Sequence, residues 1–291
     1  MPLESLVAAQ SEWARSRWPG HNSKRAPSLD DNLIVSLCGE TRAEFEKGSG
    51  GELGRNQKPG KMSSLRSSSA LGYNVFGPWR GLDLQPLGAA LRAVVRSRSI
   101  RFEQRFRHGL QSTPPNVDVV LDCDLLRPLG VECKFTEPYG TKKAHPRMDE
   151  KYFAGGRFRW TEVGLPECQA LASSLGSTSS YRRLAVGQLL KHFLGLARTT
   201  GRPPRLRYVW FDSLCSEAQE HRVEVERFES QIDDAIDFAA VTYQEIAASL
   251  RNWPEPIPDY HSYLARRYFV AWQPAGSPPG CGPGGGIRRM A

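Results

Sequence analysis

Short apolar runs recur along the chain, and their spacing predicts four strands. Residues 117–121 and 131–135 are separated by a charged connection that contains Pro and Gly, which indicates a hairpin. Residues 100–106 alternate apolar side chains with Arg and Glu, which predicts a half-buried strand ahead of the hairpin. Residues 206–211, LRYVWF, predict a further apolar and aromatic strand.

Apolar residues at helical spacing predict helices around these strands. Two pieces, residues 67–79 and 84–95, precede the first strand and are separated by breaks at Gly and Pro. The strongest helical pattern, residues 181–198, lies between the hairpin and the last strand. Three more helices are predicted after it, over residues 216–240, over 242–251 with a capping box, and over 260–269. The order helix, three strands, helix, strand indicates an α/β fold.

The two ends of the chain differ in composition from its middle. Residues 1–60 include a helical stretch over 3–17 and then become rich in Gly, Ser, Asn and charge, which predicts an irregular extension packed on the core. Residues 271–291 are mostly Gly, Pro and small residues, which bury too little apolar surface to become ordered. We therefore expect one main domain over residues 61–270.

Composition narrows the class of protein only a little. The 291 residues are 40% hydrophobic and 24% charged, which is typical of a globular protein. A net charge of +8 favours a polyanionic partner, although the same balance also serves solubility. The six cysteines form no CxxC pair, so neither a zinc site nor a disulfide framework is expected. Because no leader pattern and no long apolar run is present, we expect a cytoplasmic protein without membrane contact.

Three ionisable residues interrupt the predicted hairpin. Asp118 lies in its first strand, and Glu132 and Lys134 alternate with apolar residues in its second, so these two share a face about 7 Å apart. Two neighbouring carboxylates repel unless one is protonated or a cation lies between them. Oxygen ligands of this kind suit Mg²⁺ or Mn²⁺, and a nearby lysine could orient an attacking water. The alternative is a cross-strand salt bridge on a solvated face.

Asp118, thirteen intervening residues and then Glu132-Cys133-Lys134 resemble the active site of PD-(D/E)XK nucleases, the restriction-endonuclease-like superfamily. The phrases SSSALGYNVFGPW, PPNVDVVLD, GVECKFTEPY and QLLKHFLGLAR are similar to those of a group of bacterial proteins described as restriction endonucleases, and the resemblance covers residues 51–268. Val117 stands where the superfamily often has proline. The resemblance implies an α-β-β-β-α-β core, with a central mixed sheet flanked by helices and additional C-terminal helices.

The same resemblance implies a Mg²⁺-dependent endonuclease that acts on DNA in restriction or defence. Asp118 and Glu132 would hold the metal together with the main-chain carbonyl of Cys133, and Lys134 would position or activate the attacking water. Many such nucleases are homodimers, although no heptad or two-fold pattern in this sequence indicates one. Two alternatives stay open: a catalytically silent nucleic-acid-binding protein on this scaffold, and a nuclease for RNA or for branched or damaged DNA. The complete triad favours catalysis.

Other polar residues are candidates for supporting roles. Gln188 and Lys191 lie one turn apart on the helix after the hairpin, where related nucleases often contribute a polar residue, and a solvated helix stripe is the alternative. Glu52 and Glu103 are candidate accessory metal ligands. An exposed loop carboxylate for Glu52 and a surface salt bridge for Glu103 are the simpler expectations.

Basic and aromatic residues are interleaved over residues 140–160, directly after the hairpin. This combination suits phosphate contact and base stacking, so the segment is a candidate substrate-binding loop. Its predicted nucleic-acid-binding residues are Lys142, Lys143, Arg147 and Arg157. A solvated connection with aromatic side chains tucked into the core is the alternative.

Overall fold

The structure is a computed structural model that describes residues 3–21, 24–48, 51–55, 58–123, 127–140, 147–177, 181–213 and 215–269. A five-stranded mixed sheet with the order β3-β4-β5-β6-β7 lies at its centre. The strands are β3 (Ile100–Arg105), β4 (Asn116–Leu121), β5 (Leu129–Lys134), β6 (Arg205–Trp210) and β7 (Asp237–Thr242). Neighbours among β3, β4 and β5 pair antiparallel, whereas β5, β6 and β7 run parallel to one another.

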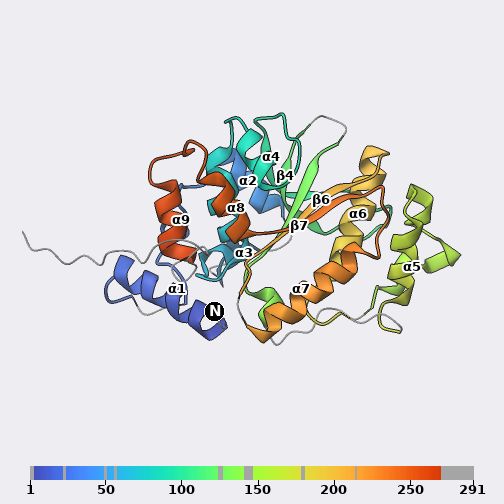
Figure 1. Cartoon of the computed structure of the whole chain (residues 1–291), viewed down its shortest axis with the longest axis horizontal. Helices are drawn as coiled ribbons and strands as arrows, with labels where there is room; N and C mark the ends of the chain where they lie inside the picture. The colour runs from blue at the N-terminus through green and yellow to red at the C-terminus, as the bar shows by residue number, and fades with distance from the viewer. Residues whose placement is uncertain are drawn as a thin grey trace, which may run out of the picture.

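Helices cover both sides of this sheet (Figure 1). One side carries α6 (Val186–Thr200) and α7 (Ser216–Glu229), with α5 (Pro166–Ser174) packed against α6. The other side carries α2 (Gly39–Lys47), α3 (Ser68–Phe76), α4 (Gln85–Ala90) and α8 (Tyr243–Leu250). There α1 (Leu3–Arg17) packs against α9 (Tyr260–Tyr268), and a small hairpin of β1 (Gly54–Arg55) and β2 (Lys58–Pro59) precedes α3. No helix of the described segments is long and apolar enough to cross a membrane.

The alternating side chains of β5 belong to two different layers of the core. Val131 and Cys133 are buried in the apolar cluster that also contains Leu71 of α3. Gly130 faces the opposite side, because a Cβ atom at that position would lie 3.5 Å from Leu196 of α6. By the same alternation, the side chains two and four residues after Gly130 point toward α6.

The structure confirms most of the predicted elements. The hairpin, the strands over residues 100–106 and 206–211, and the helices over 3–17, 242–251 and 260–269 are all present with small shifts of their ends. The predicted capping box opens α8: the Glu245 main-chain N–H donates to the Thr242 hydroxyl, and the Thr242 N–H donates to the Glu245 carboxylate. The core order α-β-β-β-α-β is therefore confirmed, with α3 first and β6 last.

The prediction of one long helix over residues 216–240 is wrong beyond Glu229. The helix α7 ends at Glu229, and residues 237–242 form β7, which pairs in parallel with β6. Two arginines of β6, Arg205 and Arg207, each bind the Asp237 carboxylate at 2.7 Å and so fix the start of this strand. Alanines at 239 and 240 favour a helix by local propensity, but pairing with the neighbouring strand decides the outcome.

Two other helices are shorter than predicted. The helix over residues 181–198 begins only at Val186, because the main-chain N–H groups of residues 182–184 donate to the Glu224 carboxylate of α7 at 2.7–2.8 Å. The second piece of the first helical layer ends at Ala90, two residues before Arg92, whose φ of 53° is left-handed.

The N-terminal residues share the core of the rest of the chain. Leu6, Leu33 and Phe45 are buried in the same apolar cluster as Val131 of β5. The helix α2 contacts β3, where the Glu44 carboxylate accepts a hydrogen bond of 3.0 Å from the Phe102 N–H. The predicted tail over residues 271–291 lies outside the described residues.

Candidate active site

The candidate site begins where the pairing of β4 with β5 stops. The last paired residues at this end are Val119 and Val131. Beyond them the Cys133 main-chain N–H donates to the Asp118 carboxylate at 2.7 Å, so an acidic side chain takes the place of a main-chain acceptor. This contact fixes the orientation of Asp118 beside the two residues that flank Cys133.

Glu132 and Lys134 extend from β5 toward α6, as their alternation with the apolar residues predicts. The Lys134 ammonium donates to Oε1 of Glu132 and, at 3.2 Å, to Oε1 of Gln188 on α6. The other Glu132 oxygen, Oε2, lies 2.9 Å from Nε2 of His192. Since residues four apart on a helix lie on the same face, α6 presents both Gln188 and His192 to this strand.

Burial and mutual interaction shift the pKa values of these side chains. Glu132 is fully buried, and although burial acts to raise its pKa, the Lys134 ammonium and His192 outweigh that effect and lower the pKa to about 2. Burial would lower the pKa of Lys134, but the carboxylates of Glu132, Asp118 and Glu137 raise it, so the ammonium stays charged. Burial and the neighbouring Glu132 charge raise the pKa of Asp118 well above its ordinary value. A cation placed beside Asp118 would therefore favour its ionised form.

Glu52 and Glu103 form a second acidic pair that extends from the first. Glu103 is 6% exposed and accepts a hydrogen bond from the Asn116 side chain, while burial and then the Glu52 charge raise its pKa to about 7. Glu52 is 7% exposed and lies 3.5 Å from the Lys61 ammonium. The expectations of an exposed loop carboxylate and of a surface salt bridge are both wrong, because both side chains are buried.

The backbone of Glu103 adopts an unusual conformation. Glu103 has a φ of 53°, a left-handed conformation inside a strand, which a non-glycine residue adopts at a cost of about 1–3 kcal/mol. A Cβ atom at Gly48 would lie 3.0 Å from the Glu103 carboxylate, so a glycine there permits the close approach. Strained conformations of this kind often lie at functional sites.

The other predicted residues make no hydrogen bond or ion pair with Asp118, Glu132 or Lys134 among the described residues. The Lys191 ammonium lies 5.4 Å from the ring centroid of Tyr152, on the same helix as Gln188. Arg147 is exposed, and Arg157 is exposed and paired with Glu162 at 2.7 Å. Lys142 and Lys143 lie outside the described residues.

The sequence interpretation missed one residue in direct contact with the triad. His192 is 1% exposed, and Nδ1, its second ring nitrogen, has no hydrogen-bond partner among the described residues. The available signal was its spacing, because it lies four residues after Gln188 on the predicted helix. The contact itself joins residues 60 apart in the sequence, which no local pattern shows.

The donor atoms suit a hard divalent cation, although no group of three or more His, Cys, Asp or Glu side chains poised to hold a metal ion occurs in the described part of the chain. The acidic side chains supply oxygen atoms only, which are the ligands preferred by Mg²⁺ and Mn²⁺. With Asp118 and Glu132 as the side-chain ligands, the main-chain carbonyl of Cys133 would be the natural third protein ligand.

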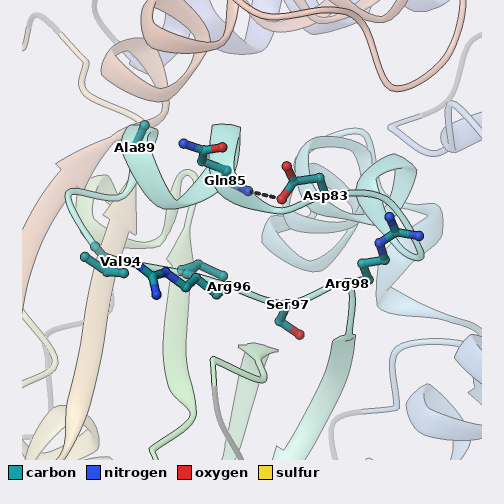
Figure 2. Close-up of a pocket in the computed structure, with 9 residues that line it drawn as sticks. Asp83, Gln85, Ala89, Val94, Arg96, Ser97 and Arg98 are labelled. Atoms are coloured by element: carbon teal, nitrogen blue, oxygen red, sulfur yellow. Dashed lines mark hydrogen bonds between the residues drawn. The ribbon is translucent and has the colours of Figure 1, made fainter.

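A separate cavity lies away from the acidic cluster. Figure 2 shows it between α4 and the segment of residues 93–98, with Asp83 and Gln85 on one wall and Arg96 on the other, and its volume is about 740 Å³. Its lower wall leads into the start of β3, where Ile100 pairs with Leu121, and its lining includes none of Asp118, Glu132 and Lys134. We therefore place the candidate chemistry at the acidic cluster.

Comparison with known proteins adds one match. A family model described as "Restriction Endonuclease associating with ARP" matches residues 9–269, which is most of the chain. Neither the curated proteins nor the solved structures contain a match. The α/β architecture, with its five-stranded mixed sheet between helices, is consistent with a restriction-endonuclease-like core.

Proposed function

Because the chain belongs to the family of restriction endonucleases associating with ARP, we propose that it is a metal-dependent endonuclease that hydrolyses DNA phosphodiester bonds. The observation that carries this proposal is the meeting of Asp118, Glu132 and Lys134 at the open end of the β4–β5 pairing. The net charge of +8 is consistent with a polyanionic substrate. A role in restriction or defence is the biology that the family suggests.

Asp118, Glu132 and the main-chain carbonyl of Cys133 would hold Mg²⁺, or Mn²⁺ in its place. When bound, the cation would stabilise negative charge at the phosphorus centre and lower the pKa of a coordinated water. The Cys133 N–H keeps Asp118 directed into the site, and His192 keeps Glu132 oriented from the opposite side. Glu52 and Glu103 are candidates for a supporting ligand set because both are buried close to the first pair.

Lys134 acts as a charged donor in this proposal. The Glu132, Asp118 and Glu137 carboxylates raise its pKa, so it is protonated when no cation is bound, and it would orient the attacking water or offset charge on a phosphate oxygen. The Gln188 side chain, which accepts a hydrogen bond from the same ammonium, would limit its rotation. Lys134 is therefore expected to have an electrostatic and positioning role.

The test is cleavage of a mixed plasmid and phage DNA panel, with matched RNA and branched DNA, in Mg²⁺ or in EDTA. Glu132→Gln and Lys134→Met keep the side-chain size, and Glu12→Gln and Lys24→Met are matched controls at exposed positions. We expect metal-dependent cutting by the wild type and by both controls, and its loss in both site variants. Equal cutting by Glu132→Gln would contradict the assignment, and cutting of RNA alone would replace DNA as the substrate.

If the folded wild type binds DNA but cuts none of these substrates with any divalent metal, the nuclease proposal fails. The catalytically silent binding protein would then be the better reading. If Glu12→Gln and Lys24→Met also lost cutting, the loss in the two site variants would not be specific to the site, and the support for the site would be removed.

A further inference from the structure

A small pocket lies directly beside the candidate active site, where α6 begins. Its volume is about 210 Å³, and it is lined by Arg147, Asp149, Ala185, Gly187, Gln188 and Lys191. Gln188 belongs to both places, because its side chain accepts a hydrogen bond from Lys134 and also forms part of the pocket wall. The pocket is therefore one side chain away from the triad.

Gly187 allows the two walls of this pocket to approach each other closely. A Cβ atom at Gly187 would lie 3.1 Å from the sulfur of Met148, which is tighter than an ordinary contact. Met148 is buried in the core cluster that contains much of α6, so the segment around Arg147 is held close to the start of the helix. The pocket is thus built from ordered parts of the chain on both sides.

Lys191 is a half-buried cation that forms no ion pair among the described residues. Its ammonium lies 5.4 Å from the centroid of the Tyr152 ring. Burial lowers the pKa of Lys191, and the Asp149 charge only partly offsets this effect. An anion in the pocket would compensate it.

The surrounding charges also favour an anion. Asp149, the one acidic side chain of the lining, lies 3.1 Å from the Lys151 ammonium, so its charge is shared between Lys151 and Lys191. Arg147 adds a second cation to the wall. Burial and then the positive charges of residues 151, 191, 159 and 198 lower the pKa of the nearby buried His108, which reports the same positive potential.

We propose that Arg147 and Lys191 bind a backbone phosphate of the substrate, next to the phosphate that the triad attacks. This inference rests on the proposed nuclease function for the identity of its ligand, and it assigns Lys191 to binding and not to the chemical step. A phosphate group fits a pocket with two cations and one acid that already lies beside a third cation, and contacts to neighbouring phosphates fix the register of a nucleic acid on a protein without reading its sequence. The pocket then selects for a strand that continues beyond the cleaved bond.

The experiment measures the affinity of a labelled DNA duplex across a series of KCl concentrations in EDTA, where no metal-dependent cleavage occurs. The variants are Lys191→Met and Arg147→Met, with Lys191→Arg as a charge-preserving version. Arg202→Met is the matched control because Arg202 is exposed and lies just beyond the far end of α6, about 16 Å along the helix axis from Lys191.

We expect each Met variant of the pocket to weaken binding and to reduce the slope of log K against log salt concentration by about 0.9, the value for one phosphate contact. Lys191→Arg and Arg202→Met should keep the wild-type slope. In Mg²⁺, Lys191→Met should raise KM and leave kcat at saturating DNA within a few-fold of the wild type. Unchanged slopes in both pocket variants, or an equal change in Arg202→Met, would overturn the inference.

The two proposals can fail separately. If the wild type cuts no substrate but the slopes change as expected, the nuclease function fails and the phosphate pocket stands. If cutting requires Glu132 and Lys134 but Lys191→Met lowers kcat and leaves the slope unchanged, the nuclease stands and the pocket assignment is wrong.

Discussion

Removing the Lys134 ammonium should destabilise the folded protein strongly, because Glu132 would then be a buried charge without its cation. The two side chains are 16% and 1% exposed, so water compensates neither well. Burial acts to raise the pKa of Glu132, but Lys134 and His192 together lower it to about 2. Breaking a buried ion pair from one side typically costs about 3–5 kcal/mol.

A pair of neutral residues should cost less than one stranded charge. We expect Lys134→Met to lower the free energy of unfolding at neutral pH by about 3 kcal/mol. The double variant Glu132→Gln/Lys134→Met should be more stable than Lys134→Met alone, because its buried carboxylate is gone. Lys151→Met, which breaks the exposed pair with Asp149, is the matched control and should change stability by less than about 1 kcal/mol.

The assay is urea unfolding in EDTA, followed by circular dichroism, for the four proteins of this cycle and the control. If Glu132→Gln added its own full loss to that of Lys134→Met, so that the double variant were the least stable, a strongly coupled buried pair would be refuted.

The same pair predicts a pH dependence with a definite sign. The folded-state pKa of Glu132 lies below its ordinary value, so its contribution to stability is fully present above pH 4.5 and is lost as the pH falls toward about 2. The difference in stability between the wild type and Lys134→Met should therefore shrink on acidification over this range. A difference that stayed constant down to the lowest pH would mean that the charge of Glu132 does not matter.

Three further predictions concern residues around the site and the fold. Glu103→Gln should stabilise the protein by up to about 3 kcal/mol near pH 8 and very little near pH 4.5. The pKa of Glu103 is raised to about 7, so the wild type loses stability as the pH rises between these values. Equal effects at both pH values in urea unfolding would contradict this. Gly60→Ala should lower the melting temperature clearly, because its Cβ would lie 2.1 Å from the Glu52 main-chain oxygen. Gly39→Ala is the control and should not lower it, because no atom lies within 4 Å of the Cβ position. Similar melting temperatures for the two variants would argue against close packing around Gly60. Thr242→Ala should cost about 1 kcal/mol in unfolding free energy and leave DNA cleavage unchanged, and a loss of cleavage at full occupancy of the folded state would connect β7 to the site.

The sequence by itself determined the strands of the hairpin and the face on which Glu132 and Lys134 lie. A strand repeats every two residues, so the alternation of Glu132 and Lys134 with Val131 and Cys133 fixes which side chains are buried in the first core cluster and which point toward α6. The capping box at Thr242 is equally local, because both of its hydrogen bonds join residues three apart. Patterns of this kind survive folding because the backbone itself imposes their period.

Tertiary structure decided the features that join distant parts of the chain. Residues 237–242 became a strand because β6 offers them a partner, against the helical preference of their alanines. His192 meets Glu132, and Glu52 meets Glu103, only after helix, strand and loop have packed together. Burial in that packing, and not residue type, gave Glu103 a pKa of about 7 and lowered the pKa of Lys191. Charge on a residue can be read from the sequence, but its energy depends on which groups the fold places around it.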